Sequence, residues 1–278
     1  MDWNKSNTIL IIAFLVVNVF LFGFIYISDN FTEKYDLEEK EDFLNSVKEI
    51  LKTKNITISC EIPSKVYKAP FLEIKYDIIN PSKEIIENFI GEYDGIINDE
   101  ILFYENEFES IEIVGMKKII YNNEKAYNTE IKNAESVDNI ISDFCNEKKI
   151  DASNFIKVNE INADDYKLVT FVERYKGYNL ENAYINFYIK GEEVFKFEMQ
   201  KIVSLNERAQ ITSIPAAEAL LRLMTYDSIN NKEITDIQIC YYTSENEEFE
   251  NINSINVDLV WKVVFSDNTF VYLVAGEY

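Results

Sequence analysis

The chain has 278 residues, of which 47% are apolar and 14% aromatic, so it has the composition of a folded protein with a core rather than of a disordered or fibrous chain. Its 49 acidic and 27 basic residues give a formal charge of −22, which argues against nucleic acid as a partner and against attraction to anionic lipid headgroups. Histidine is absent, which removes imidazole-based catalysis and histidine-containing zinc motifs. We therefore expect no enzyme, no catalytic, cofactor-binding or metal-binding residues, and no cofactor.

The segment from Thr8 to Ile27 predicts a membrane-spanning helix. It carries no charge, and only Thr8, Asn18 and Gly23 fall outside the apolar set. At about 1.5 Å per residue such a helix is about 30 Å long, which matches the hydrocarbon core of a bilayer. No small-residue cleavage site follows it, so we expect a permanent anchor rather than a cleaved signal peptide.

Residues 1–7 form a short leading end that we expect to remain in the cytoplasm. The chain behind the span would then be exported, which predicts a single-pass protein of the cell membrane with an extracellular carboxyl-terminal part. This orientation depends on the short leading end, because the basic residues on the two sides are nearly balanced.

One face of the span is predicted to contact a partner helix. An amide in hydrocarbon gains about 0.6 to 2 kcal/mol from a partner on another helix, and Asn18 is such a group. The alternative is that Asn18 is tolerated alone. The predicted transmembrane partner face, at three- and four-residue spacings, comprises Ile11, Phe14, Leu15, Asn18, Leu21, Phe22 and Ile25.

Residues 28–54 are predicted to form a polar tether followed by a juxtamembrane helix from Asp36 to Lys54. The apolar residues of this helix fall on one stripe, which is typical of a helix that packs on a core. Packing on the chain's own domain is favoured over pairing with a partner's helix. The stripe consists of Leu37, Leu44, Val47 and Leu51.

Residues 55–132 are predicted to form a first α+β unit. Apolar and charged residues alternate from Leu72 to Ile78, as in half-buried antiparallel strands. Ser82 is expected to cap a short helix that Gly91 closes. Further strands are expected at residues 56–58, 101–104, 108–114 and 118–121.

Residues 133–205 are predicted to form a second α+β unit, which opens with a helix from about Ser136 to Lys148. A long strand is expected at residues 167–175. Two more strands, at residues 183–189 and 194–203, are expected to form a hairpin that turns at Gly191.

Residues 206–278 are predicted to form a third α+β unit. Ser213 is expected to cap a helix over residues 216–226, with Pro215 in its first turn. Strands are expected at residues 234–242, 259–265 and 269–275. The last two units share the order helix, long strand, hairpin, so the predicted fold class is α+β: a transmembrane helix followed by units of antiparallel sheet and helix.

The three cysteines, Cys60, Cys145 and Cys240, are widely spaced and form no CxxC pair. Each lies among apolar neighbours, so we interpret them as small buried hydrophobic residues. Their odd number allows at most one disulfide within the chain, and the sequence leaves open whether one forms.

Three stretches together resemble the YycI family, membrane-anchored regulatory proteins of low-GC Gram-positive bacteria. The first is Met1–Lys5 followed at once by the single span. The second is Arg208–Leu220, with Ile239–Tyr242 after its helix, and the third is the closing strand and hairpin with Val260–Val264 and Ala275–Glu277. The turn of that hairpin departs from the family pattern because it lacks the expected glycine.

The resemblance implies a non-enzymatic regulator of a cell-wall-controlling sensor histidine kinase of the WalK type, also called YycG. It also implies that the protein acts by transmembrane and extracellular contacts with this kinase and with a YycH-like protein. The residues leave open the sign of the regulation and whether a ligand is sensed.

Two alternative functions follow from the residues of the exported part. An extracellular module that binds peptides or wall fragments could line a groove with aromatic side chains, although aromatics at strand spacing more often form core and cross-strand pairs. A wall hydrolase with two carboxylates is less favoured, because so many acidic residues place some pair at a suitable distance by chance. The aromatic candidates are Tyr175, Tyr178, Tyr184, Phe187 and Tyr188.

Overall fold

A computed structural model describes residue 14 and residues 41–97, 101–128, 136–244 and 252–277. The predicted span at residues 8–27 and its partner face lie outside the described residues, apart from Phe14, which is helical and exposed. In the described ranges, no helix has both the length and the apolar character needed to cross a membrane. The anchor and its orientation therefore stay predictions.

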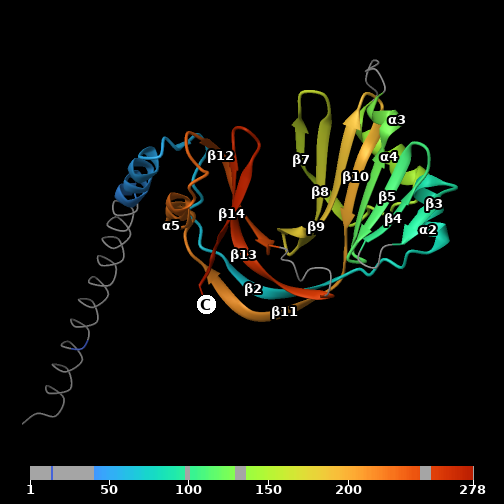
Figure 1. The fold of residues 1–278 in the computed structure, drawn as a ribbon. Helices are drawn as coiled ribbons and strands as arrows, with labels where there is room; N and C mark the ends of the chain where they lie inside the picture. Colours follow the sequence, from blue (N-terminus) through green and yellow to red (C-terminus); the bar gives the residue numbers. More distant parts are fainter. Residues whose placement is uncertain (1–13, 15–40, 98–100, 129–135, 245–251, 278) are drawn as a thin grey trace, which may run out of the picture. The chain divides into compact units, whose positions relative to one another are not determined.

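In the described residues, short helices separate runs of consecutive strands (Figure 1). A helix at residues 41–52 comes first. The strands are β1 (Thr57–Ile58), β2 (Lys68–Tyr76), β3 (Asp94–Ile97), β4 (Ile101–Glu105), β5 (Glu109–Val114), β6 (Lys118–Asn123), β7 (Phe155–Asn162), β8 (Lys167–Tyr175), β9 (Tyr178–Lys190), β10 (Glu193–Gln200), β11 (Ile202–Ser213), β12 (Glu233–Tyr242), β13 (Ser254–Phe265), β14 (Phe270–Val274) and β15 (Gly276–Glu277). The other helices are α2 (Lys83–Ile90), α3 (Glu124–Tyr127), α4 (Val137–Glu147), α5 (Ala216–Leu220) and the 3-10 helix η1 (Leu221–Thr225).

The chain divides into two compact units, the first made of Met1–Thr57 with Leu223–Asn231. The helix at residues 41–52 buries Val47 and Leu51 completely, which confirms that this part of the predicted stripe packs within the chain. Its end is held by hydrogen bonds to the second segment: Lys54 Nζ donates to the carbonyl of Tyr226 at 2.9 Å, and Asn231 N donates to the carbonyl of Lys54 at 3.0 Å.

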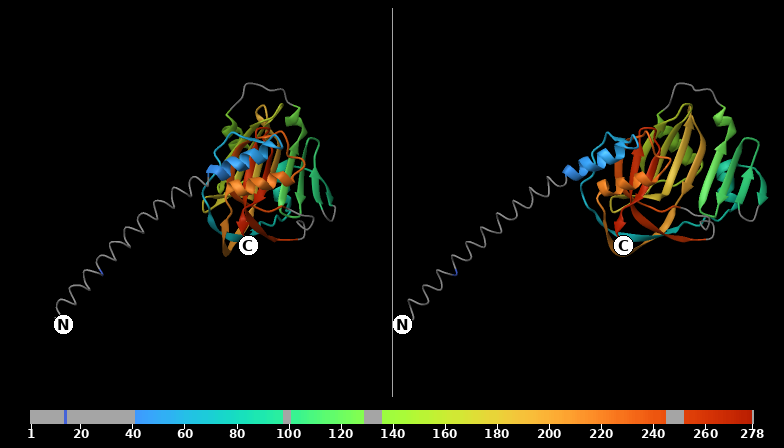
Figure 2. Two further views of the ribbon diagram at one scale, coloured as in Figure 1. Left: turned by 90° about the vertical axis from the view of Figure 1, so that its left-hand side faces the viewer. Right: turned by 60° about the vertical axis from the view of Figure 1, so that its left-hand side comes forward.

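The second unit, Ile58–Arg222 with Lys232–Tyr278, is built on one connected sheet. Its strands follow the order β15-β11-β2-β13-β12-β9-β10-β6-β5-β4-β3, with β8 also pairing β9, β7 pairing β8 and β14 pairing β13. The pair β9–β12 is parallel, and the other pairings described within this unit are antiparallel. The strands β2 and β11 lie side by side (Figure 2).

Helices α2 and α4 cover the part of the sheet that is formed by β5, β6, β10 and β9 (Figure 1). Ser82 Oγ accepts a hydrogen bond from Ile85 N at 3.4 Å at the start of α2, and Gly91, at φ +69°, donates its N–H to Glu87 at the end, as predicted. The core between helices and sheet is rich in aromatic rings, with ring centroids 5.4 Å apart for Phe144 and Phe197. The sequence of α2 thus fixes both its ends, and its apolar face, with that of α4, fixes where the helices pack.

A second set of buried residues lies where β2, β12 and β13 meet. Trp261 is 1% exposed and donates its indole N–H to the carbonyl of Ile214 at 3.1 Å. Tyr241 is fully buried and donates its hydroxyl to the carbonyl of Pro70 at 2.6 Å. Pro70 is opposite Gln210 beside a register shift in the β2–β11 ladder, which is the kind of position where a strand tolerates a residue without an N–H.

The helix after β11 begins at Ala216 as predicted, but its predicted cap is wrong. Ser213 is the last residue of β11, and its Oγ accepts a hydrogen bond from Tyr67 N at 2.9 Å. Pro215 instead occupies the N-cap position. The α-helix covers residues 216–220 and a 3-10 helix continues it to Thr225, so the helical segment has nearly the predicted length but changes type after Leu220.

The strand predictions are largely confirmed in β1, β2, β4–β6, β8–β10 and β12–β14, but four strands were missed, namely β3, β7, β11 and the short β15. Of these, β11 follows a break at Lys201, near the expected end of a single strand at residues 194–203. Residues of all three predicted α+β units join in the one sheet, and the division of residues 55–278 into those units stays a prediction.

The turn between β13 and β14 explains how the chain manages without the expected glycine. Asn268 adopts φ +62°, a left-handed conformation that asparagine tolerates better than most residues. Asp267 accepts hydrogen bonds from Lys232 and Thr269, which lower the pKa of its carboxyl to about 2.

We predict that Asp267 makes the turn sensitive to acid. Because its pKa is lowered in the folded state, its stabilising contribution is complete above about pH 4 and is lost as the pH falls towards 2. Asp267→Asn should flatten the loss of thermal stability in this range, whereas Asp164→Asn, at an exposed position between β7 and β8, should leave it unchanged. An NMR titration that gives Asp267 a pKa near 4 would contradict the prediction.

Candidate functional site

A cavity of about 520 Å³ lies between two groups of strands in the second unit. One wall comes from β7, β8 and β9 and the other from β12, β13 and β14, the two strand groups seen in Figure 1. Its volume falls in the range of sites that hold small molecules. We call it the Glu181 cavity, and it is lined by Val158, Asn159, Ile161, Leu168, Thr170, Val172, Asn179, Glu181, Tyr184, Asn186, Tyr188, Asp236, Gln238, Lys262, Val264, Asn268, Phe270 and Tyr272.

The alternation of side chains along β9 separates the cavity from the core. Ile185 and Phe187 are buried on the core side, whereas Tyr184, Asn186 and Tyr188 line the cavity. The same two-residue spacing brings alternate residues of β8 to it. Strand faces rather than strand edges therefore form the walls.

A break in the β8–β9 ladder positions the polar end of the cavity. Val172 is opposite Tyr184, but the next residue of β8, Glu173, is opposite Leu180. Residues 181–183 of β9 are thus left out of this ladder as an enlarged bulge, a feature that redirects side chains.

Asn182 holds this bulge in place. Its side chain is 3% exposed and forms two hydrogen bonds of 2.9 Å with the backbone of Thr243, donating from Nδ2 to the carbonyl and accepting at Oδ1 from the N–H. Its own carbonyl accepts from Gln200 Nε2 at 2.9 Å. The preceding residue, Glu181, is thereby fixed in the cavity wall.

Glu181 is buried, and only one of its two carboxylate oxygens is paired. Oε2 accepts from Lys262 Nζ at 2.6 Å and from the Tyr272 hydroxyl at 2.9 Å, and the side chains of Glu181 and Lys262 are 6% and 13% exposed. Oε1 has no hydrogen-bond partner among the residues that the structure describes. Oε1 is itself enclosed by surrounding atoms, so its missing hydrogen bond costs about 1 to 3 kcal/mol and the oxygen is not presented to the cavity.

The surroundings of Glu181 keep its neighbours protonated. Burial and the charge of Glu181 raise the pKa of Tyr272, so the phenol remains a donor. Burial, with Glu181 again contributing, raises the pKa of Cys240 well above its usual value, which leaves a neutral thiol rather than a reactive thiolate. Burial also raises the pKa of Cys145 to about 11 and that of Cys60, and none of the three cysteines forms a disulfide.

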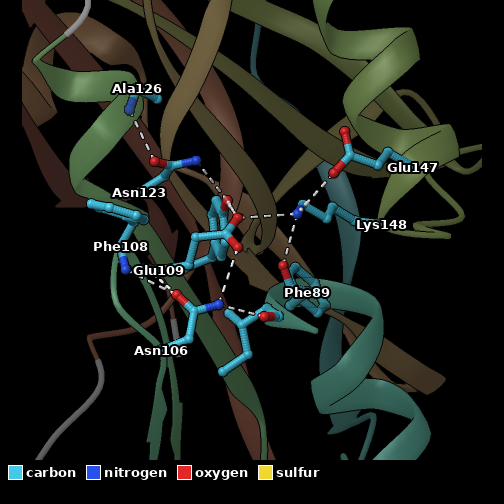
Figure 3. Close-up of polar contacts among 10 residues, drawn as sticks. Phe89, Asn106, Phe108, Glu109, Asn123, Ala126, Glu147 and Lys148 are labelled. Atoms are coloured by element: carbon cyan, nitrogen blue, oxygen red, sulfur yellow. Dashed lines mark hydrogen bonds and ion pairs between the residues drawn. The ribbon is translucent and has the colours of Figure 1, made fainter. Parts of the chain in front are cut away.

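A second buried charge, Lys148, lies at the end of α4 and serves the fold (Figure 3). Its side chain is 8% exposed, and Nζ contacts the carbonyl of Phe89 at 2.7 Å, Glu147 at 3.0 Å and Glu109 at 3.3 Å. The Tyr121 hydroxyl also donates to Glu109. These three acceptors match the three N–H donors of the ammonium, so the group is fully used in joining α2, α4 and β5.

The structure divides the five predicted groove aromatics among different places. Tyr184 and Tyr188 line the cavity, but Phe187 points to the core, the place that was favoured for aromatic residues at strand spacing over the alternative of a groove. Tyr178 packs edge-on against the buried Tyr241, and the Tyr175 hydroxyl donates to Glu207.

The three residues at the polar end of the cavity, Glu181, Lys262 and Tyr272, were missed by sequence reasoning. Glu181 and Asn182 are two polar residues in succession that interrupt the alternation of β9, a signal that could have indicated a bulge. Lys262 and Tyr272 gave no signal, because polar residues are expected at alternate positions of a half-buried strand.

Apart from Phe14, the predicted transmembrane partner face lies outside the described residues. In the part of the chain that the structure describes, no group of three or more Cys, Asp or Glu side chains is arranged to hold a metal ion.

Comparison with known proteins gives one family match and similarities of fold. The family model YycI, described as YycI protein, matches residues 36–274. The structure is similar to that of YycH from Bacillus subtilis, with a TM-score of 0.52 at 9% identity over 76% of this chain and 53% of YycH, so the chain spans about half the length of that structure. The Bacillus megaterium YpeB C-terminal domain matches with a TM-score of 0.34 at 10% identity over 83% of this chain and 92% of that domain. No curated protein matches by sequence.

We predict that Asn182→Ala lowers the free energy of unfolding by about 2 kcal/mol, because it leaves the N–H and carbonyl of Thr243 without their partners. Asn154→Ala, at an exposed position, should change it by less than about 0.5 kcal/mol. Urea denaturation of both variants is the measurement, and equal midpoints for the two would contradict the role of Asn182.

We also predict that Lys148→Met lowers the free energy of unfolding by about 2 to 3 kcal/mol, because Glu109 and the carbonyl of Phe89 lose a charged donor inside the fold. Lys149→Met is the matched control, since the neighbouring Lys149 is exposed. If denaturation shows the two variants to be equally stable, Lys148 does not have the structural role assigned to it.

Proposed function

The chain belongs to the YycI family, and from this premise we propose that it is a non-enzymatic regulator of a WalK/YycG-like sensor histidine kinase that controls the cell wall. The observation that carries the proposal is the family match over residues 36–274, which includes both compact units in large part. The family is known in the context of this kinase system.

The polar end of the Glu181 cavity supports a protein that binds rather than one that catalyses. A glycosidase needs two carboxyl groups facing each other, one of which gives up a proton. In this cavity the buried carboxylate of Glu181 is held in an ion pair by Lys262, an arrangement that suits recognition and not proton donation.

The proposed mode of action is contact at two levels. The predicted anchor at residues 8–27 would place Asn18 beside a helix of the kinase or of a YycH-like partner, and the exported part would contact the partners outside the membrane. Similarity of fold to YycH supports a pairing of two related domains. A coupling free energy of about 1 to 3 kcal/mol between regulator and kinase is enough to shift the balance of kinase states.

The test is co-purification of the full-length chain with the kinase and the YycH-like protein from membranes. Asn18→Leu, on the predicted partner face, should lower recovery of the partners at least about fivefold, which corresponds to about 1 kcal/mol. Phe20→Leu, on the opposite side of a helix at this position, should leave recovery unchanged.

Kinase autophosphorylation in vesicles, measured with and without the chain, tests the regulation itself. A change in rate in either direction is expected. Unchanged recovery of the partner proteins with Asn18→Leu would contradict the proposed transmembrane contact. An unchanged autophosphorylation rate would contradict the proposed regulatory role.

A further inference from the structure

A second pocket of the second unit, of about 390 Å³, lies beside the turn between β8 and β9. Among the described residues, its lining includes two cationic side chains and no acidic one, in a chain with 49 acidic residues and a charge of −22. The Glu181 cavity, by contrast, has Glu181 and Asp236 in its walls. We call the second pocket the Arg174 pocket, and its walls include Tyr67, Arg174, Lys176, Tyr178, Asn179 and Ile239.

The turn between β8 and β9 orients the guanidinium group of Arg174. Lys176 and Gly177 form this two-residue turn at φ +48° and +90°, the left-handed conformations that a tight hairpin requires. The turn places Arg174 opposite Asn179, and Arg174 Nε donates to Asn179 Oδ1 at 2.9 Å. Arg174 is exposed, and its two NH₂ groups have no hydrogen-bond or ion-pair partner among the described residues. They are therefore available to an acceptor from outside the chain.

Two phenol hydroxyl groups add donors to the same pocket. The rings of Tyr67 and Tyr178 meet edge to face with their centroids 6.1 Å apart, and Tyr67 packs in the same way on the buried Trp261 at 5.8 Å. In the described chain neither hydroxyl has a hydrogen-bond partner, and neither is enclosed by surrounding atoms, so both are accessible. Burial, with Tyr67 contributing, raises the pKa of Tyr178, so its hydroxyl stays protonated and can donate.

The charges of the lining favour a ligand with one negative charge. Lys176 is compensated by its ion pair with Glu207, whereas Arg174 has no acidic partner in the part of the chain that the structure describes. A carboxylate carries a single charge, and its two oxygens fit two parallel N–H groups of one guanidinium.

Two charges just outside the lining offset each other. Nζ of Lys65 lies 5.0 Å from the centroid of the Tyr67 ring, and Oδ1 of Asp236 accepts a hydrogen bond from Ile237 N at 2.9 Å. The uncompensated charge that faces an occupant is therefore that of the guanidinium group.

The rest of the pocket offers apolar surface to the body of such a ligand. Pro63, Tyr67 and Ile239 line it and are half-buried, so each keeps part of its surface accessible. A volume of about 390 Å³ lies in the range of small-molecule sites. A carboxylate on a compact apolar body would satisfy both parts of the pocket.

We propose that the Arg174 pocket binds the carboxylate of a small apolar acid, with the guanidinium of Arg174 donating to its oxygens and the hydroxyls of Tyr67 and Tyr178 supplying further donors. Such a carboxylate can be the free end of a peptide or belong to a simple organic acid, and the experiment separates these two sources. Binding is measured without any partner protein, so failure of the regulatory proposal would leave this one standing.

The experiment is isothermal titration calorimetry on the full-length chain in a non-ionic detergent, with titrations into detergent alone subtracted. N-acetylphenylalanine represents a peptide end and 3-phenylpropionate an organic acid. N-acetylphenylalanine amide is the uncharged analogue, and inorganic phosphate is a different anion.

At least one of the two carboxylates should bind with a Kd below about 1 mM, and the amide should bind at least about tenfold more weakly. Binding of N-acetylphenylalanine alone assigns the pocket to peptide ends, binding of 3-phenylpropionate alone assigns it to organic acids, and binding of both assigns it to either source. Each of these results supports the proposal.

Arg174→Gln should weaken carboxylate binding at least about tenfold, because it removes the charge and the paired N–H donors. Arg208→Gln is the matched control, since Arg208 is exposed and already forms an ion pair with Glu73, and it should bind like the unaltered chain.

Tyr67→Phe is measured in parallel because it keeps the aromatic ring and leaves Arg174 unaltered. It should weaken binding about three- to tenfold through loss of a hydroxyl donor. Absence of binding by both carboxylates would overturn the proposal, and so would unchanged affinity in either variant. Equal affinity for the amide, or tighter binding of phosphate than of either carboxylate, would also overturn it.

Discussion

The fold depends on the way in which β9 divides its pairing among three neighbours. Its first residues pair in parallel with β12, and its later residues run between β8 and β10. Residues 181–183 lie between the residues that pair with β12 and those that pair with β10, and they are also left out of the β8 ladder. Asn182 holds this stretch with side-chain hydrogen bonds to Thr243. Both the helix-covered part of the sheet and the part around Trp261 are attached to this one strand. The cavity arises where the two strand groups separate, so the topology and the candidate site have a common cause.

The ammonium groups of Lys148 and Lys262, two of the lysines inside the fold, show how similar interactions can serve different purposes. Lys148 has an acceptor for each of its donors, and its carboxylate partner Glu109 is shared with Tyr121. Glu181 has its charge compensated by Lys262 but keeps one oxygen without a partner in the described chain. A saturated buried pair joins elements, whereas an incomplete one keeps the energetic cost of an enclosed acceptor without a partner. The volume and the lining of the Glu181 cavity, rather than this oxygen, identify it as the candidate site.

The sequence correctly predicted those helices and hairpins whose ends are determined by residues within the same segment. Helix α2 is confirmed at both ends because Ser82 and Gly91 act within the segment, and the β9–β10 hairpin is confirmed because Gly191 occupies its turn. Prediction failed where a distant segment decides. The hydroxyl of Ser213 accepts a hydrogen bond from Tyr67, a residue far away in the sequence. Strand β11 is mostly exposed, so its sequence lacks the apolar alternation that marks a half-buried strand. In the candidate site, Tyr184 and Tyr188 were accessible to prediction from strand spacing. Lys262 and Tyr272 were not, because their meeting with Glu181 depends on a register break that no local pattern specifies.

The hydrogen bonds at the end of the helix at residues 41–52 also bear on mechanics. Lys54 is tied to Tyr226 and Asn231, about 170 residues further along, and the chain continues from Asn231 directly into β12. Tension applied to the amino-terminal side would therefore follow two routes, one along the backbone after Lys54 and the other through these bonds to the start of β12. β12 carries Asp236 and Gln238, which line the Glu181 cavity. A pulling force on the amino-terminal side and a molecule bound in the cavity would therefore act on the same strand.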